Sequence, residues 1–251
     1  MTHQLVTAVF IRHKLLILRI KMLRTLLFNF TFFFALFSFA DGHDDAKSES
    51  DSSGYILMST YEMPYGGKYQ DLEKSLIKEA KAGVKDGHDS CSLYRHVQGS
   101  QRAFYLICAF KTMEQFAEIM SIERDYSNDK QLFASHTDHI LSRVKVELDG
   151  PPPFVMFGKW RPGPNLSMLD FSDRMSSFQK AFSKSFGSCN EYVHAWGPEY
   201  AGYLACGFDD WNHFAKAAAA ADENVVAALS SYPVTGIVSH SDELLVRVYP
   251  K

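Results

Sequence analysis

The chain has 251 residues, of which 26 are Lys or Arg and 29 are Asp or Glu, so its formal charge at pH 7 is −3. Removing residues 1–40, which hold five basic and no acidic side chains, leaves 21 basic against 29 acidic side chains and a formal charge of −8. A chain this acidic is a poor candidate for binding nucleic acid, which requires clustered positive charge.

Residues 1–40 predict a cleavable secretory signal. After Met22, a basic start is followed by an apolar run that ends with small residues at Ser38 and Ala40, as such signals do. We expect the true start at Met22, cleavage after Ala40, and a secreted or periplasmic protein with no stable membrane insertion after cleavage. An uncleaved anchor is the alternative, although basic side chains interrupt the first half of the apolar stretch. The acidic, serine-rich segment 41–54 predicts a disordered linker.

Residues 55–149 and 154–251 are two copies of one unit, joined by the short proline-rich linker 150–153. Ser90–Ala117 aligns with Ser188–Ala215 at a constant offset, with 12 identities in 28 positions. Average composition gives roughly 2 identities by chance. The chain is therefore a tandem duplication of a unit with the size of a small domain.

Each copy predicts the element order β-α-β-β-α-β. Period-two patterns predict strands at 55–63, 90–98, 101–110 and about 140–148, and at the equivalent positions of the second copy from 154–160 to 244–249. Helical spacing of apolar residues predicts helices about Leu72–Ala80, Met113–Met120, Met168–Phe182 and Trp211–Ala218. This order is the ferredoxin-like pattern, an antiparallel sheet with helices on one face.

All four cysteines lie in the duplicated hairpin. A glycine-led turn in each copy pairs residues so that Cys91 is opposite Cys108 and Cys189 is opposite Cys206. In an oxidising compartment these pairs predict two hairpin disulfides, and buried free thiols are the alternative. No Cys-x-x-Cys spacing supports a metal site.

The two faces of the hairpin differ in character. One face suits packing under helices and carries Cys91, Leu93, Val97, Phe104, Leu106 and Cys108. The other is bulky and aromatic and carries Tyr94, His96, Tyr105 and Ile107, matched in the second copy by Tyr192, His194, Trp196 and Tyr203. An apolar face of this size normally meets a partner, and the second sheet of the same chain is available.

The element order, the duplication and the aromatic strand faces resemble the dimeric α+β barrel superfamily. It includes antibiotic-biosynthesis-monooxygenase-like, EthD-like, NIPSNAP-like, stress-responsive A/B barrel, chlorite-dismutase and haem-degrading proteins. The resemblance covers about 55–250 and implies an α+β fold in which two tandem ferredoxin-like units face each other as an intramolecular α+β barrel. It implies a monomeric fused barrel or a homodimer of it, and no motif selects one family.

The aromatic face supplies the candidate site residues. We expect a ligand to contact Tyr94, Tyr105, Tyr192, Trp196 and Tyr203. His96 and His194 are the candidate catalytic residues, because an imidazole beside phenols can accept a proton, anchor a ligand or bind haem. A core histidine bonded to a tyrosine hydroxyl is the alternative. Smaller side chains open the second hairpin, which directs attention to His194 and Trp196.

A second repeated cluster, Ser-His-[Thr/Ser]-Asp, occurs at 135–138 and 239–242. Its secondary candidate residues are His136, Asp138, His240 and Asp242. Residues this close in sequence rarely align as nucleophile, base and orienting acid, so local hydrogen bonds at a loop-to-strand junction are the competing interpretation. His136 and His139 would share a metal only on a helical turn, and we expect no metal site.

Three functions remain open. The first is an exported binding protein that holds a small apolar or aromatic molecule between its sheets. The second, implied by the resemblance, is a monooxygenase-like or haem-dependent oxidoreductase that uses a barrel histidine, with either no cofactor or haem. The third is a non-catalytic protein whose aromatic face is a packed core. A cavity in the barrel favours the first two, and crystal-like packing favours the third.

Overall fold

A computed structural model describes residues 54–99, 101–123, 131–231 and 236–251. The predicted signal and nearly all of the predicted linker at 41–54 lie outside these residues. The first copy forms β1 (Tyr55–Glu62), α2 (Tyr69–Lys85), β2 (Ser90–Gln98), β3 (Ala103–Phe110), α3 (Met113–Met120) and β4 (Ser135–Lys145). The second copy forms β5 (Phe154–Pro162), α4 (Met168–Phe186), β6 (Cys189–Trp196), β7 (Gly202–Phe208), α5 (Trp211–Ser231) and β8 (Ile237–Tyr249).

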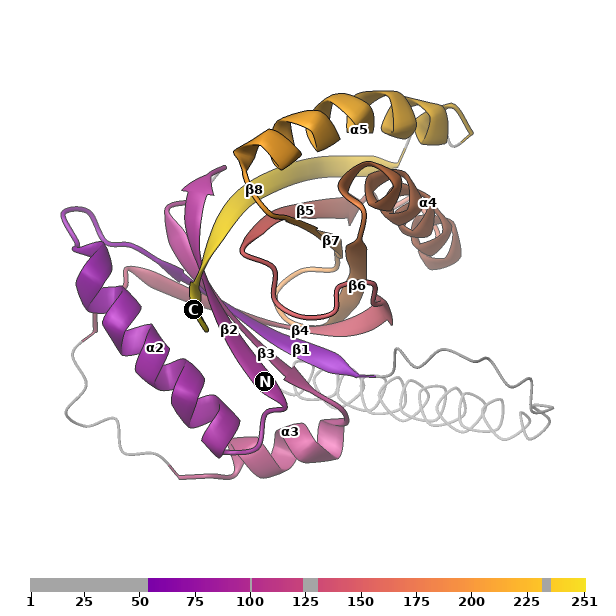
Figure 1. The fold of residues 1–251 in the computed structure, drawn as a ribbon. Helices are drawn as coiled ribbons and strands as arrows, with labels where there is room; N and C mark the ends of the chain where they lie inside the picture. The colour runs from indigo at the N-terminus through magenta and orange to yellow at the C-terminus, as the bar shows by residue number, and fades with distance from the viewer. Residues whose placement is uncertain (1–53, 100, 124–130, 232–235) are drawn as a thin grey trace, which may run out of the picture. The chain divides into compact units, whose positions relative to one another are not determined.

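The strands close into one barrel with the order β1-β3-β2-β8-β5-β7-β6-β4 (Figure 1). Each copy contributes one antiparallel sheet, and the pairs β2–β8 and β4–β6 join the two sheets. The helices lie outside, α2 and α3 over the first copy and α4 and α5 over the second (Figure 1). The predicted fold, two ferredoxin-like units in an intramolecular α+β barrel, is confirmed.

The alternation of side chains along the strands separates an inner core from outer cores. The aromatic face points inward, where Tyr94, Tyr105, Tyr192 and Tyr203 are all buried. The opposite face packs under the helices and includes Leu93 and Phe104 of the first copy, but Val97 is 45% exposed and does not join it. The hairpins have the predicted register, with Tyr94 opposite Tyr105 and Tyr192 opposite Tyr203.

The last strand of each copy begins earlier than the apolar pattern indicates. β4 starts at Ser135 and β8 at Ile237, so both Ser-His-[Thr/Ser]-Asp clusters lie within strands. The expectation of a loop-to-strand junction is therefore wrong. These polar segments are held in the sheet by pairing with β1 and β5 along their length, and a backbone ladder needs no apolar side chain.

Local sequence signals account for the helix ends. Ser167 caps α4 by accepting a hydrogen bond from the Asp170 amide, 3.1 Å away, and Thr112 caps α3 in the same way through the Gln115 amide. Gly187 ends α4 at φ 89°, a conformation that glycine adopts without a Cβ penalty.

Both predicted disulfides are confirmed. Cys91 is bonded to Cys108 and Cys189 to Cys206, with a Cα–Cα distance of 4.1 Å in each pair. Each pair is buried between its hairpin and the covering helices. Two such bonds indicate an oxidising environment. In the part of the chain that the structure describes, the helices are too short or too polar to span a membrane.

Replacing either cysteine pair with serine should destabilise the barrel. Each bond closes a loop with a sequence separation of 17, and a loop of this size contributes about 3 kcal/mol to the free energy of unfolding. Urea denaturation of Cys91→Ser/Cys108→Ser and of Cys189→Ser/Cys206→Ser measures this loss. Because the loops are equal, we expect similar losses in both variants, and an unchanged midpoint in either would contradict this role for that bond.

Candidate functional site

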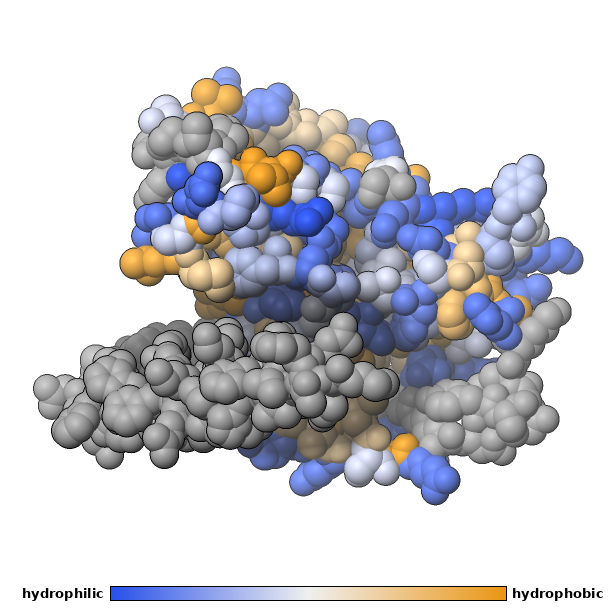
Figure 2. Space-filling model, turned by 180° about the vertical axis from the view of Figure 1, so that it is seen from behind, coloured by the Kyte–Doolittle hydropathy of each residue, from blue (hydrophilic) through white to orange (hydrophobic). Residues whose placement is uncertain are grey.

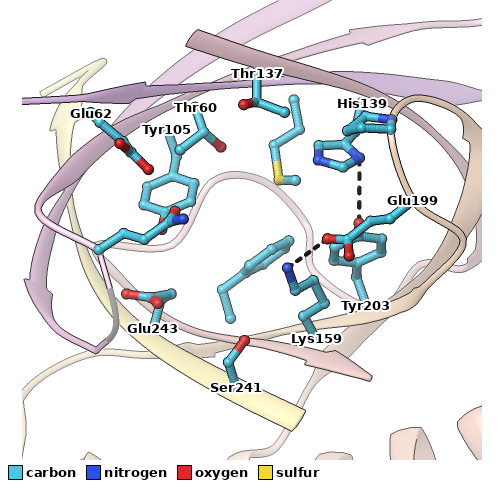
Figure 3. A pocket seen from close by; sticks show the side chains of 14 residues that line it. Thr60, Glu62, Tyr105, Thr137, His139, Lys159, Glu199, Tyr203, Ser241 and Glu243 are labelled. Carbon is cyan, nitrogen blue, oxygen red and sulfur yellow. Dashed lines mark hydrogen bonds and ion pairs between the residues drawn. The ribbon is translucent and has the colours of Figure 1, made fainter. Parts of the chain in front are cut away.

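A cavity of about 210 Å³ opens at one end of the barrel interior (Figure 3). Its apolar walls are Met58 of β1 and Phe157 of β5, and both side chains are buried. Around them converge polar side chains from β1, β3, β4, β5, β7 and β8 and from both hairpin turns, namely Thr60, Glu62, Gln101, Tyr105, Thr137, His139, Lys159, Glu199, Tyr203, Ser241 and Glu243. The lining is therefore mainly polar around a small apolar centre, and such converging polar groups can fix the orientation of a small molecule.

The cavity residues come in pairs that the duplication relates. On β1 and β5 the equivalent pairs are Met58 with Phe157 and Thr60 with Lys159. On β4 and β8 they are Thr137 with Ser241 and His139 with Glu243. The remaining pairs are Tyr105 with Tyr203, on β3 and β7, and Gln101 with Glu199, in the hairpin turns. Strand register supports these pairs: Met58 is opposite His139, and Phe157 is opposite Glu243. The cavity thus lies on the approximate two-fold axis between the copies.

One half of the cavity, here called the histidine half, consists of His139, Lys159, Glu199 and Tyr203. The Tyr203 hydroxyl is 3.5 Å from His139 Nδ1, a distance at the outer limit of a hydrogen bond. Burial lowers the pKa of His139, and Lys159 adds to this effect while Glu199 opposes it. His139 is therefore a neutral imidazole at neutral pH, able to accept a proton.

Glu199 forms ion pairs with Lys159 of the histidine half and with the neighbouring Arg161. Its carboxylate lies 2.7 Å from Lys159 Nζ and 3.0 Å from Arg161 Nε. Although desolvation raises the pKa of Glu199, its contacts with Lys159 and Arg161 outweigh that effect and hold the pKa below its usual range. Burial raises the pKa of Tyr203, and Glu199 adds to the rise, so the phenol keeps its proton.

The other half, here called the glutamate half, consists of Thr60, Glu62, Gln101, Tyr105 and Glu243. The Glu243 carboxylate is buried and lies 3.5 Å from His96 Nε2. Burial raises the pKa of Tyr105, and the charges of Glu243 and Glu62 raise it further. Because its pKa is raised, the Tyr105 phenol stays protonated and can donate a hydrogen bond.

The glycine at each hairpin turn packs directly on a site residue. Gly197 has φ 141°, and a Cβ atom there would lie 2.9 Å from His139 Nδ1. Gly99 has φ 137°, and a Cβ atom there would collide with the Glu243 carboxylate. Glycine is required at both turns for its conformation and for this close approach, and so the turns help to position the two halves.

The predicted ligand contacts divide between the cavity and the deeper core. Tyr105 and Tyr203 line the cavity. Tyr94 and Tyr192 are buried further inside, where the Tyr94 hydroxyl donates to the Pro152 carbonyl at 3.2 Å and the Tyr192 hydroxyl accepts from Asn190 Nδ2 at 3.0 Å. These bonds satisfy both hydroxyls, so Tyr94 and Tyr192 act within the core of the barrel.

The predicted catalytic histidines lie just behind the cavity walls. His96 contacts Glu243, and His194 lies close enough to His139 to contribute to lowering its pKa. The His194 ring packs edge-on against Tyr200, with ring centroids 5.8 Å apart, and its Nδ1 atom is buried without a hydrogen-bond partner among the described residues. Both histidines adjoin a cavity residue rather than the cavity itself.

Trp196 does not point into the space between the sheets. It is 67% exposed, and that expectation is wrong. Trp196 is the last residue of β6, where the pairing with β4 shifts register between Ile140 and Leu141. At the end of a strand, the neighbouring strands do not extend far enough to bury the side chain.

The two His-Asp pairs lie on the outer surface of the barrel. His136 is 2.9 Å from Asp138, and His240 is 3.0 Å from Asp242. Each imidazole stacks on an aromatic ring, Tyr61 or Trp160, with centroids 4.5 and 4.6 Å apart. The interpretation as local hydrogen-bonded clusters therefore holds, although they lie in strands.

The residues that sequence reasoning missed are the direct neighbours of these pairs. His139 and Glu243 each follow an outward-facing aspartate, so their side chains point inward. The period-two alternation of β4 and β8 is the signal that identifies them, and it is hard to detect because the first parts of both strands are polar. His136 and His139 point to opposite faces, and no group of three metal-ligating side chains occurs among the described residues.

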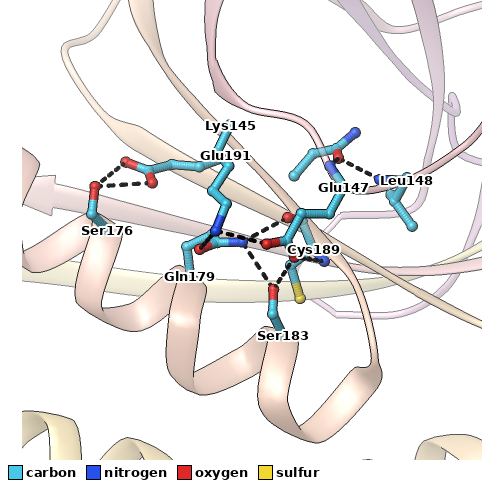
Figure 4. Close-up of polar contacts among 9 residues, drawn as sticks. Lys145, Glu147, Leu148, Ser176, Gln179, Ser183, Cys189 and Glu191 are labelled. Carbon is cyan, nitrogen blue, oxygen red and sulfur yellow. Dashed lines mark hydrogen bonds and ion pairs between the residues drawn. The ribbon is translucent and has the colours of Figure 1, made fainter. Parts of the chain in front are cut away.

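A second polar cluster lies outside the barrel and fastens the end of β4 to α4 and β6 (Figure 4). Glu147 receives a hydrogen bond from Ser183 at 2.6 Å and lies 2.8 Å from Lys145 Nζ. Although desolvation raises the pKa of Glu147, these contacts lower it to about 2. Nearby, burial raises the pKa of Glu191 to about 7, despite hydrogen bonds from Ser176 at 3.1 and 3.3 Å.

Perturbed carboxyl groups can mark a functional site, but this cluster serves as a structural joint. Its contacts join residues 145–148, which follow the first copy, to α4 and β6 of the second copy, and they include two bonds from the backbone amides at 147 and 148 to Asn190 Oδ1. The view from behind likewise shows mainly hydrophilic side chains, with hydrophobic ones scattered among them (Figure 2). The inner cavity remains the candidate site.

Fold and cavity together define an α+β barrel protein with a small internal site, and known structures share this fold. No protein-family model matches the sequence, and no curated protein matches it. A "putative monooxygenase" from Fusobacterium nucleatum subsp. nucleatum superposes with a TM-score of 0.55 and 8% identity, over 79% of this chain and 94% of the other.

Two further structures agree. An "anthrone oxidase-like protein" gives a TM-score of 0.54 and 7% identity over 79% of this chain and 93% of that one. A "putative monooxygenase" from Lactobacillus acidophilus NCFM superposes with a TM-score of 0.51 and 11% identity, over 78% of this chain and 94% of that one. At these identities the likeness shows the α+β barrel fold alone and assigns no family.

Glu191→Gln should change stability in a pH-dependent way. The folded pKa of about 7 lies above the ordinary value of 4.5, so the folded protein binds the proton more tightly and wild-type stability falls as pH rises from about 4.5 to 7. Glutamine stays neutral, so the variant should gain stability relative to wild type between pH 4.5 and pH 8. Urea denaturation at both pH values measures the gain.

Glu118→Gln, an exposed change on α3, is the control and should give the same difference from wild type at both pH values. If Glu191→Gln behaved as this control does, Glu191 would ionise in the folded protein as freely as in the unfolded chain.

Proposed function

We propose that this protein is an exported small-molecule-binding barrel that holds one substituted aromatic ring between its two sheets. The proposal rests on the cavity of about 210 Å³, in which polar groups converge on an apolar centre. For scale, an apolar cavity of about 150 Å³ suffices to bind benzene. The space left between the aromatic faces speaks against the packed-core alternative.

The proposed location rests on three features. Both disulfides require an oxidising compartment, residues 22–40 have the pattern of a cleavable signal, and the chain beyond residue 40 has a formal charge of −8. We place the protein in the periplasm or outside the cell, as a monomeric fused barrel, because one chain supplies both sheets that a barrel of this kind needs.

Haem does not fit this cavity. Drug-sized ligands occupy pockets of roughly 300–1,000 Å³, and a porphyrin is at least that large, whereas the cavity measures about 210 Å³. An axial ligand also needs a free ring nitrogen facing an open space, and His96 faces the Glu243 carboxylate while His194 packs on Tyr200. We therefore assign no step to haem.

A second candidate function is cofactor-independent proton abstraction. His139 favours proton abstraction, because burial keeps this imidazole neutral. The positive charges of Lys159 and Arg161 lie close enough to Glu199, on the same side of the cavity, to stabilise an anion there. A weakly acidic O–H of the ligand would pass its proton to His139, leaving a phenolate and an imidazolium. Two barrels of this fold are named as monooxygenases, but anthrone, with three fused rings, is too large for this cavity.

Binding of a single-ring probe tests the first proposal. Tyrosol, a neutral phenol with a hydroxyethyl chain, should bind the mature chain with one site by isothermal titration calorimetry. Ser241→Phe fills the cavity from β8 and should abolish binding, while Ser172→Phe places the same side chain on the exposed face of α4 and should not. Equal binding by all three proteins, or none by the wild type, would refute the cavity as the site.

Ionisation of a bound phenol tests the second candidate function, proton abstraction by His139. Bound 4-nitrophenol, whose absorbance reports its ionisation, should lose its proton at a lower pH than the free phenol, because His139 accepts the proton and nearby cations stabilise the phenolate. His139→Gln should cancel this shift while Ser172→Phe leaves it in place. If the bound and free probe ionised at the same pH in the wild type, His139 would not act as a base.

A further inference from the structure

The two copies place unlike charges at equivalent positions of the cavity mouth. Duplication made these positions identical at first, and four pairs have since diverged, namely Glu62 and Arg161, Thr60 and Lys159, Glu243 and His139, and Gln101 and Glu199. All of these residues line the cavity except Arg161, which contacts the lining residue Glu199. The first two pairs lie on β1 and β5, the third on β8 and β4, and the fourth in the hairpin turns. Divergence of this kind replaces a symmetric site with one that has two different ends.

The histidine half is the positive end. Lys159 and Arg161 share the single carboxylate of Glu199, at 2.7 and 3.0 Å. His139 stays neutral because burial disfavours its charged form. When Arg161, which contacts Glu199 from outside the cavity lining, is counted with this half, its fixed charges sum to about one positive charge. Such an end suits a hydroxyl, carbonyl or phenolate oxygen.

The glutamate half is the negative end. It carries Glu62 and Glu243 on either side of Tyr105, and both charges act on that phenol. Glu243 is only 6% exposed, so its field is poorly screened by water. The Glu243 carboxylate also lies 3.5 Å from His96 Nε2. This end suits a cationic nitrogen.

Aromatic rings connect the two ends. Phe157 lies between the tyrosines, with ring centroids 5.7 Å from Tyr203 and 6.4 Å from Tyr105. Figure 3 shows the two groups of polar side chains on opposite sides of this central apolar part. A ligand ring can pack against these aromatic side chains, between the two ends.

We propose that the ligand is an aryl-alkyl amine, with its phenol or other oxygen in the histidine half and its ammonium group between Glu62 and Glu243. The inference rests on the proposed binding function and specifies its ligand class. A buried ammonium group is costly without partners, and the two carboxylates supply them. An aryl-alkyl acid of the same size would instead place its carboxylate against Glu62 and Glu243.

Three probes of nearly equal shape isolate the charge. Tyramine carries an ammonium group, tyrosol a hydroxyl, and 4-hydroxyphenylacetate a carboxylate on the same phenol ring. By calorimetry at pH 8, we expect tyramine to bind the mature wild-type chain at least about tenfold more tightly than tyrosol, as charge-assisted hydrogen bonds allow. We expect 4-hydroxyphenylacetate to bind more weakly than tyrosol.

Variants then assign the preference to the glutamate half. Glu62→Gln/Glu243→Gln keeps the shape of the cavity and should lower tyramine affinity to that of tyrosol, leaving tyrosol binding within about twofold of wild type. Glu118→Gln on the exposed face of α3 is the matched carboxylate control and should keep the full preference. Denaturation midpoints of all variants establish that they fold.

The outcomes separate this inference from the proposed function. If tyrosol binds in the cavity and tyramine binds no more tightly, the binding function stands and the amine inference is overturned. A tyramine preference that survives in Glu62→Gln/Glu243→Gln would also overturn it, because residues other than these two carboxylates would then bind the ammonium group. If none of the probes binds, the binding function itself fails.

Discussion

Closure of the barrel is the constraint on which the rest of this structure depends. A ferredoxin-like sheet by itself leaves edge strands, here β2 and β4 in the first copy and β6 and β8 in the second, with unpaired backbone groups that invite aggregation. It also leaves one apolar face uncovered. Pairing β2 with β8 and β4 with β6 removes all of these edges and turns the two aromatic faces toward each other. The interior and its cavity exist only because both sheets are present.

Closure gives each strand an inside and an outside, and the period of two assigns each residue to one of them. The disulfides take the outer positions, under the helices, where they fasten each hairpin without using interior volume. The His136 and His240 pairs are also outside. Along the same two strands, His139 and Glu243 are inside. One step in sequence therefore separates a surface cluster from the candidate site.

The sequence predicts what depends on short-range pattern and on the duplication. Hairpin register follows from the turn glycines, so the opposition of Cys91 and Cys108 was predictable, and so were the element order and the inward direction of Tyr105 and Tyr203. The cavity residues were harder. His139 and Glu243 lie in polar strand segments that only their pairing with β1 and β5 holds in the sheet, and apolar periodicity cannot detect such strands. Glu199 lies in a turn, where no pattern indicates direction.

Fusion of the two units in one chain is what permits the unequal ends of the cavity. In a barrel made from two identical chains, the two-fold axis repeats every residue, so a glutamate at one end would appear at both. Two like carboxylate groups across a small cavity would repel each other and bind no ligand with different ends. Within one chain, Glu62 and Arg161 are free to diverge, as are His139 and Glu243. The duplication thus kept the scaffold symmetric, because the backbone pairing requires it, and allowed the charges that a ligand meets to become opposite.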